Sequence, residues 1–204
     1  MLFRSALAAS QGHLRGIAVV EPSIPFEEMT RMHALGVRGI RFNLFGAKHN
    51  LAPWLQQAAL WDQMTELGWH VELHTDPGRL PEVLPQLPSA IRVVVDHMSK
   101  PLKAHVSDPT IEMLRRDGSH RVMVKLSGAY RQAGIDAHEL TQVLLGEMGP
   151  DALLWGSDWP CTNHEPYADY AALRASLDQW LGQGPVDQVV CHNPMRLYWN
   201  VTHD

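Results

Sequence analysis

The amino-acid sequence predicts an α/β fold in which a parallel sheet is connected by helices. Short β-branched runs alternate with longer helical patterns throughout the 204 residues, which is typical of parallel strands joined by helical crossovers. No glycine-rich phosphate loop follows the first apolar run at 16–20, which disfavours an open dinucleotide-binding sheet. Polar residues instead stand at the ends of nearly all predicted strands, as in a (β/α) barrel. We therefore expect a TIM-barrel-like fold with six β/α units.

The individual elements follow from short apolar runs and from helical periodicity. The expected strands cover residues 16–20, 37–42, 70–74, 92–96, 122–126 and 153–155. The expected helices cover residues 26–35, 55–67, 111–116, 137–148, 167–181 and 186–199. Gly36 and Gly68 directly follow two of these helices, where a left-handed cap is needed. With no linker or repeat in the sequence, we interpret residues 1–204 as a single domain.

Composition excludes several classes of function. The net charge is −5 and Lys and Arg form no cluster, which argues against a nucleic-acid partner. The apolar run at the N-terminus is short and interrupted by Arg4, and no apolar run approaches the roughly 20 residues that span a bilayer. The two cysteines, Cys161 and Cys191, lie far apart and lack metal-ligand spacing. We therefore expect no disulfide, no membrane partner and a cytoplasmic location.

Polar or ionisable residues stand at the ends of five successive predicted strands. In chain order they are Arg41 and Asn43, His74, Asp96 and His97, Lys125 and Ser127, and Asp158. The strands of a barrel are buried on both faces, where an unpaired charge is costly. One such residue would be unremarkable, whereas five strand ends in succession predict a shared polar site.

Two of these residues are candidates for catalysis, and each has a plainer interpretation. His97 could point into the barrel mouth and polarise a carbonyl, or it could only bond a backbone carbonyl while Asp96 caps the following loop. Asp158 could be a general base that activates water, or a metal ligand. Its alternative is a turn or N-cap aspartate. Trp159 beside it is expected to exclude water and raise the pKa of Asp158.

Other residues suit an anionic small-molecule substrate. Arg41 and Arg131 carry planar guanidinium groups that can grip a carboxylate at two points, although Arg131 could equally be a solvated surface residue. Asn163, in the loop after Asp158, is a further substrate-binding candidate. Ser157 is not in a Gly-x-Ser-x-Gly context, so a serine nucleophile is not expected.

Taken together, five motifs resemble the amidohydrolase-related TIM-barrel family that includes 2-pyrone-4,6-dicarboxylate lactonase and sugar-acid lactonases. They are Gly-Ile-Arg-Phe-Asn at 39–43, Val-Asp-His-Met at 95–98, Val-Lys-Leu-Ser-Gly-Ala-Tyr-Arg at 124–131, Leu-Trp-Gly-Ser-Asp-Trp-Pro at 154–160 and His-Asn-Pro-Met-Arg-Leu-Tyr at 192–198. The resemblance implies that Asp158 is the general base and that His97 faces the substrate carbonyl. It also implies that Arg41 and Arg131 bind carboxylates. His74 stands where the dicarboxylate lactonases have an aromatic hydroxyl and metal-dependent members have a histidine ligand.

The sequence departs from the family pattern at its start. The family begins with a strand carrying a His-x-His pair, followed by a second strand, and this sequence contains neither. Residues 1–10 resemble the end of the second crossover helix. We therefore expect an N-terminally incomplete barrel with exposed strand edges. Either another chain, such as a second copy, covers these edges, or the chain is a truncated product of low stability.

These expectations combine into a functional hypothesis. The resemblance implies a hydrolase that opens a lactone or cyclic ester of a (di)carboxylic acid in aromatic compound catabolism, with no cofactor. Lys125, Ser127, Asn43, Trp159 and Asn163 would contact the substrate. One alternative is a zinc-dependent amidohydrolase or decarboxylase of the same fold, which would have to hold its metal with His74, His97 and Asp158. The other is an inactive remnant that only binds carboxylates.

Overall fold

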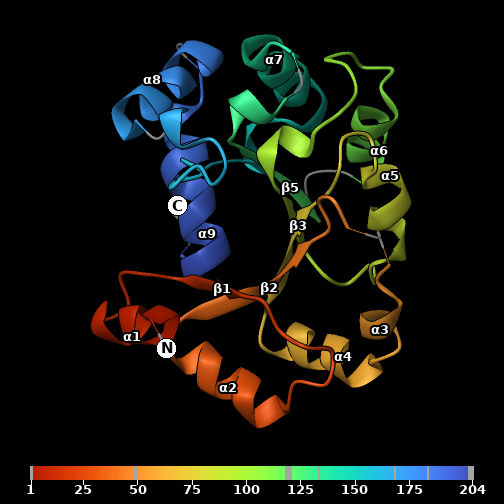
Figure 1. Cartoon of the computed structure of the whole chain (residues 1–204), viewed down its shortest axis with the longest axis vertical. Coiled ribbons are helices and arrows are strands. Elements are labelled where there is room, and N and C mark those ends of the chain that lie inside the picture. Colours follow the sequence, from red (N-terminus) through yellow and green to blue (C-terminus); the bar gives the residue numbers. More distant parts are fainter. Residues whose placement is uncertain are drawn as a thin grey trace.

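Six parallel strands form one sheet in the computed structural model, and their spatial order is their chain order (Figure 1). The structure describes residues 2–47, 50–117, 121–132, 134–167, 169–182 and 184–201. The strands are β1 (Gly16–Ala18), β2 (Val37–Asn43), β3 (His70–His74), β4 (Val93–Val95), β5 (Val122–Leu126) and β6 (Leu153–Trp155). A doubly wound sheet would reverse this order at its middle. The predicted α/β, barrel-like class is therefore confirmed.

Helices occupy the connections between the strands. They are α1 (Leu2–Ala9), α2 (Phe26–Ala34), α3 (Ala52–Leu55), α4 (Ala58–Glu66), α5 (Leu80–Val83), α6 (Pro109–Asp117), α7 (Ala137–Met148), α8 (Tyr170–Leu181) and α9 (Asn193–Trp199). Shorter helical turns are η1 (Leu84–Gln86), η2 (His97–Ser99), η3 (Ala129–Arg131), η4 (Pro150–Ala152), η5 (Glu165–Tyr167) and the π-helix η6 (Gln188–His192).

Several predicted boundaries are wrong for local reasons. The helix expected at 55–67 is two helices, because Gln57 leaves the helical region with φ −100° and ψ 74°. The helix expected at 167–181 begins at Tyr170, where the side chain of Asp169 caps it. The helix expected at 186–199 contains the π-helical turn η6 before α9. Strand β1 ends at Ala18, and Val19 beyond it is 78% exposed.

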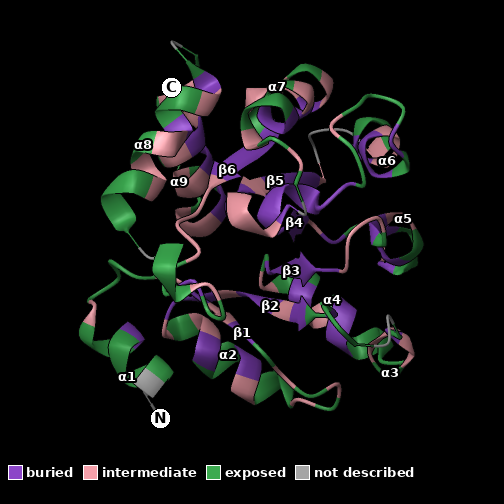
Figure 2. Cartoon of the chain, turned by 45° about the horizontal axis from the view of Figure 1, so that its top comes forward, coloured by how far each residue is buried: buried purple, intermediate pink, exposed green. Residues whose placement is uncertain are grey.

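The sheet has two faces with different partners. Val93, Val95, Val122 and Val124 belong to the main core, which they share with the surrounding helices. Figure 2 shows these strands buried inside a shell of helices whose outer sides are exposed. Alternate side chains of a strand point to opposite faces, so the residues between these valines face the inner side. The functional groups lie on that inner face.

Helix α9 covers part of the inner face. Leu197 packs in a separate apolar cluster with Val94, Met123 and Leu154. The same helix reaches the segment before β1, where Arg15 Nε donates to the Tyr198 carbonyl at 3.1 Å. In Figure 1 α9 runs beside the sheet toward β1. Within the described residues, β1 and β6 each pair with one strand, and α9 contacts both ends of the sheet.

Two further expectations concern the surroundings of the chain. Within the described residues, no helix combines the length and apolarity needed to cross a bilayer. A cytoplasmic location and a second copy over the exposed strand edges remain predictions.

Candidate active site

Four charged side chains form the floor of the site on the inner face of the sheet. Lys125 Nζ lies 3.0 Å from Glu72 Oε1 and 2.9 Å from Asp96 Oδ1. The Arg41 guanidinium lies 3.2 Å from Glu72 Oε2 and also ion-pairs with Asp96 Oδ2. Each cation thus bridges both carboxylates. We call these four residues the floor network.

The floor network is electrically balanced and strongly coupled. Burial disfavours a charged Asp96, but Lys125 and then Arg41 outweigh it and hold its pKa at about 2. Burial likewise opposes the charge of Lys125, whereas Glu72 and Asp96 raise its pKa. The Tyr198 hydroxyl donates to Glu72 Oε1 at 3.1 Å. Asp96 and Lys125 are therefore charged at neutral pH, and each charged group of the network has an ion-pair partner.

Asp158 lies above this floor with one oxygen fully engaged and the other turned toward His97. The Tyr130 hydroxyl and Arg131 Nε both donate to Asp158 Oδ2 at 2.7 Å. Asp158 Oδ1 lies 3.9 Å from His97 Nε2. That separation is too long for a direct hydrogen bond, so a third polar atom can approach both groups.

The prediction that Trp159 raises the pKa of Asp158 is wrong. The Trp159 side chain is 68% exposed and does not seal the carboxylate from water. Burial does raise the pKa of Asp158, but the hydrogen bonds from Tyr130 and Arg131 outweigh it, so the pKa lies below its usual range. Asp158 is therefore a carboxylate at neutral pH.

His97 is buried, and burial lowers its pKa to about 4, so its imidazole is neutral at neutral pH. Its Nδ1 lies 3.2 Å from Ser127 Oγ. A Cβ on Gly128 would lie only 2.7 Å from that Nδ1, and Gly128 has φ +58°. The Gln132 amide donates to the His97 carbonyl at 2.9 Å. The loop after β5 therefore fixes the ring of His97 through packing and hydrogen bonds.

An unusual left-handed turn carries His97. The φ angles of His97, Met98, Ser99 and Lys100 are +51°, +54°, +60° and +46°. Left-handed geometry costs about 1–2 kcal/mol for each residue with a Cβ, and such strain is characteristic of functional sites. The turn places Lys100 Nζ 2.8 Å from His74 Nε2. The ring centroids of His74 and His97 are 4.6 Å apart.

The predicted site residues separate into three groups. Those that line one cavity of about 340 Å³ are Arg41, His97, Lys125, Ser127, Asp158 and Trp159. His74 and Arg131 contact lining residues, and Arg131 is held by Asp158 rather than solvated. Asn43 and Asn163 are exposed and outside the residues that line this cavity. Substrate binding by these two asparagines therefore has no support from the geometry.

Sequence reasoning missed four residues of the site, which are Glu72, Lys100, Tyr130 and Tyr198. Glu72 could have been found, because His70, Glu72 and His74 alternate along a short strand and must share one face. Tyr130 stands next to Arg131 in a motif already noted. Tyr198 also ends a motif already noted, at 192–198. Lys100 has no comparable local signal, because it reaches the site from outside the strands.

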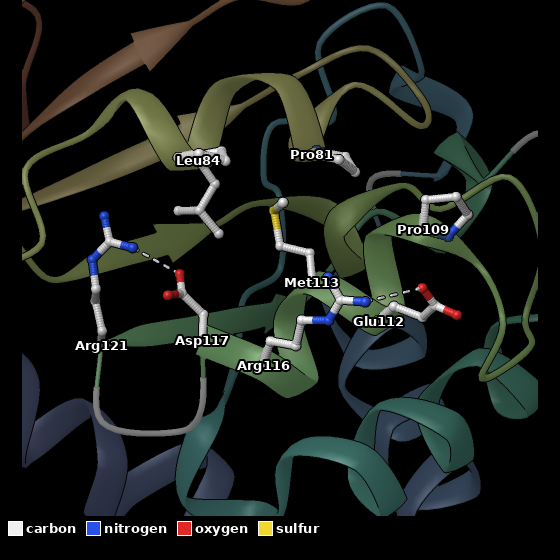
Figure 3. Close-up of a pocket in the computed structure, with 9 residues that line it drawn as sticks. Pro81, Leu84, Pro109, Glu112, Met113, Arg116, Asp117 and Arg121 are labelled. Carbon is white, nitrogen blue, oxygen red and sulfur yellow. Dashed lines mark hydrogen bonds and ion pairs between the residues drawn. The ribbon is translucent and has the colours of Figure 1, made fainter.

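A second cavity of about 370 Å³ lies between α5, η1 and α6, away from these groups (Figure 3). Its charged side chains pair with one another. Arg121 binds Asp117 at 2.7 Å, and Arg116 lies 3.8 Å from Glu112. We therefore place the candidate active site in the 340 Å³ cavity, although its volume is slightly smaller. There, a carboxylate and a neutral imidazole retain free hydrogen-bonding capacity.

The described residues do not offer a preformed metal site. No group of three His, Cys, Asp or Glu side chains in that part of the chain is arranged to hold an ion. His74 Nε2 faces the ammonium of Lys100 at 2.8 Å, which would repel a cation. The zinc alternative thus does not fit His74, His97 and Asp158, and a metal-independent reaction remains a prediction.

Comparison with known proteins supports the family assignment. The amidohydrolase family model matches residues 1–199. A 2-pyrone-4,6-dicarboxylate hydrolase of Comamonas testosteroni is 30% identical over 95% of this chain and 70% of its own length. A 4-sulfomuconolactone hydrolase of Rhizobium radiobacter is 30% identical over 80% of this chain and 56% of its own length.

The fold comparison agrees with the sequence comparison. A crystal structure of a provisionally named 2-pyrone-4,6-dicarboxylic acid hydrolase from Pseudomonas putida superposes with a TM-score of 0.86 at 28% identity. It matches 99% of this chain and 78% of that chain. The predicted resemblance and hydrolase class are therefore confirmed, and the chain belongs to the amidohydrolase family.

Proposed function

We propose that this chain hydrolyses a lactone or cyclic ester of a (di)carboxylic acid, with Asp158 as the general base. The geometry of Asp158 carries the proposal. Tyr130 and Arg131 fix one carboxylate oxygen at 2.7 Å, while the other oxygen faces His97 Nε2 at 3.9 Å. The relatives named above are both lactone hydrolases by name.

In the proposed reaction, Asp158 Oδ1 accepts a proton from a water molecule, and the water oxygen attacks the lactone carbonyl carbon. The resulting tetrahedral intermediate collapses by breaking the bond between the carbonyl carbon and the ring oxygen. The proton on Asp158 then passes to that leaving oxygen, so the base is regenerated. The lowered pKa of Asp158 keeps the carboxylate ionised at neutral pH, which is the form that can accept a proton.

His97 would stabilise the negative charge that develops on the carbonyl oxygen. When the Ser127 hydroxyl donates to Nδ1, at 3.2 Å, the ring proton resides on Nε2. Nε2 faces Asp158 and the cavity and can donate to the oxyanion. A donor held in place before the reaction contributes more than a mobile one, because no reorganisation is needed.

The test is the hydrolysis of 2-pyrone-4,6-dicarboxylate and of a panel of neutral and anionic lactones, and the loss of ring absorbance measures the rate. We expect Asp158→Asn to lower kcat about 10²- to 10⁴-fold, the usual contribution of a general base. Asp62→Asn, an exposed carboxylate on α4, is the matched control and should retain full activity. Equal rates for the wild type and Asp158→Asn would refute the proposed base.

The same preparations test the metal question. Elemental analysis should find no near-stoichiometric zinc, and chelator treatment should leave the rate of hydrolysis unchanged. Near-stoichiometric zinc that is lost together with activity would contradict the metal-independent reaction and favour the zinc alternative.

A further inference from the structure

Most cationic side chains around the cavity already form ion pairs with carboxylates of the protein. Arg41 and Lys125 each pair with both Glu72 and Asp96. Arg131 pairs with Asp158 at 2.7 Å. A bound carboxylate would have to compete with a buried partner for each of these three cations. If Arg41 and Arg131 bound the substrate, as the sequence predicted, the negative charge of the substrate would find no cation that lacks a partner.

Lys100 is the exception among the charged groups of the site. It is only 4% exposed, and no ion pair of its Nζ with a carboxylate occurs within the described residues. Its Nζ lies 2.8 Å from His74 Nε2 and 3.9 Å from the ring centroid of Phe45. A Lys ammonium has three N–H donors. One donates to His74 and one faces the aromatic ring, which leaves a third for another acceptor.

The surroundings hold this ammonium in one place. The rings of Phe45 and His74 stack with centroids 5.2 Å apart and planes 3° from parallel. The Gly78 amide donates to the Lys100 carbonyl at 2.8 Å, which fixes the end of the left-handed turn. Burial and then Arg131 lower the pKa of Lys100 to about 8, although nearby carboxylates oppose this shift. A buried ammonium without an ion-pair partner is unfavourable, and an anion beside it would relieve that cost.

We propose that Lys100 binds a carboxylate substituent of the substrate, in a subsite formed by Lys100, His74 and Phe45 next to His97. This inference rests on the proposed lactonase function and names the side chain that would recognise the charge. The Phe45 ring, which is 51% exposed, covers the ammonium on its outer side. The lactone carbonyl would lie between His97 and Asp158, with the carboxylate directed toward Lys100.

The experiment measures binding by calorimetry in the Asp158→Asn background, in which turnover is expected to be at least about 10²-fold slower. The ligands are 2-pyrone-4,6-dicarboxylate, 2-pyrone-4-carboxylate, 2-pyrone-6-carboxylate and neutral 2-pyrone. Lys100→Met keeps the aliphatic stem and removes the charge, and Lys100→Arg restores it. Lys103→Met, which removes a charge from an exposed lysine three positions later, is the matched control. Thermal melting of every variant confirms that it is folded.

We expect Lys100→Met to weaken binding of the dicarboxylate and of one monocarboxylate about 10- to 100-fold, the loss typical of one charge-assisted hydrogen bond. The other monocarboxylate and 2-pyrone should bind as before, and Lys100→Arg should recover most of the loss. Equal weakening of all four ligands, or no weakening of any, would overturn the subsite. A wild-type protein that binds these ligands but never hydrolyses them would refute the proposed reaction. The binding comparison would still test the Lys100 subsite.

Discussion

The floor network and the pair Asp158 and His97 above it both consist of polar, ionisable side chains, but they differ in how far these side chains are already paired. In the floor network, Arg41 and Lys125 saturate Glu72 and Asp96, so every charge has a partner. Above it, one carboxylate oxygen of Asp158 is 3.9 Å from His97 Nε2, too far for a direct hydrogen bond, and the imidazole of His97 is neutral. Buried ion pairs contribute little to stability yet are costly to break. The comparison indicates that the floor positions the site, whereas the reactive capacity lies in the layer above.

Removing a floor charge should have the largest effect on stability. Glu72→Gln leaves two cations facing one carboxylate, and breaking a buried pair typically costs about 3–5 kcal/mol. Urea denaturation would measure the change in the free energy of unfolding. Glu66→Gln, at an exposed position of α4, should change it little. A Glu72→Gln protein as stable as the wild type would show that the floor network does not hold the site together.

The next largest effect concerns pH. His70 is fully buried and makes no hydrogen bond through either ring nitrogen in the described residues, and burial and then Lys125 lower its pKa to about 3. The unfolded chain protonates this histidine near its ordinary value, so the folded state loses stability as the pH falls below that value toward about 3. The loss between pH 7 and pH 5 is about 2 kcal/mol at most.

His70→Phe should therefore flatten the acid side of the stability profile. The measurement is the free energy of unfolding at both pH values for the wild type, His70→Phe and the control His13→Gln, which alters an exposed histidine. An unchanged pH dependence in His70→Phe would contradict the prediction.

Tyr198→Phe should have a smaller effect on the floor. It removes the 3.1 Å hydrogen bond to Glu72 Oε1, and a hydrogen bond to a charged group contributes about 1.5–3 kcal/mol. Because Glu72 keeps both cations, the free energy of unfolding should fall by less than in Glu72→Gln. A double-mutant cycle with Glu72→Gln would show whether the two effects share one interaction.

Asp158→Asn should have the smallest effect on stability despite its large effect on rate. The amide oxygen can still accept from Tyr130 or Arg131, so we expect a change below about 1 kcal/mol in the free energy of unfolding. A loss as large as that of Glu72→Gln would mean that Asp158 is a structural residue, and the contrast between the two layers would disappear.

The sequence was sufficient for the strands and for the strand-end residues, because both follow from local apolar periodicity. It identified β3, β5 and β6 with their observed bounds. It could not reveal that Arg41 and Arg131 are already paired, because those partners come from other strands and loops. For the same reason it gave the wrong direction for the pKa of Asp158, since Trp159 is its neighbour in sequence while Tyr130 and Arg131 are its neighbours in space.

The position of α9 has a consequence for the order of assembly. Each strand pairs with the strand that precedes it in the chain, so the sheet can grow by successive addition from local contacts, which form readily. Helix α9 follows all six strands, yet its Tyr198 contacts Glu72 over a separation of 126 residues and Arg15 over 183. A nascent chain would therefore carry a nearly formed sheet with an uncovered inner face until α9 docks, and this interval is when the polypeptide would be most exposed to aggregation.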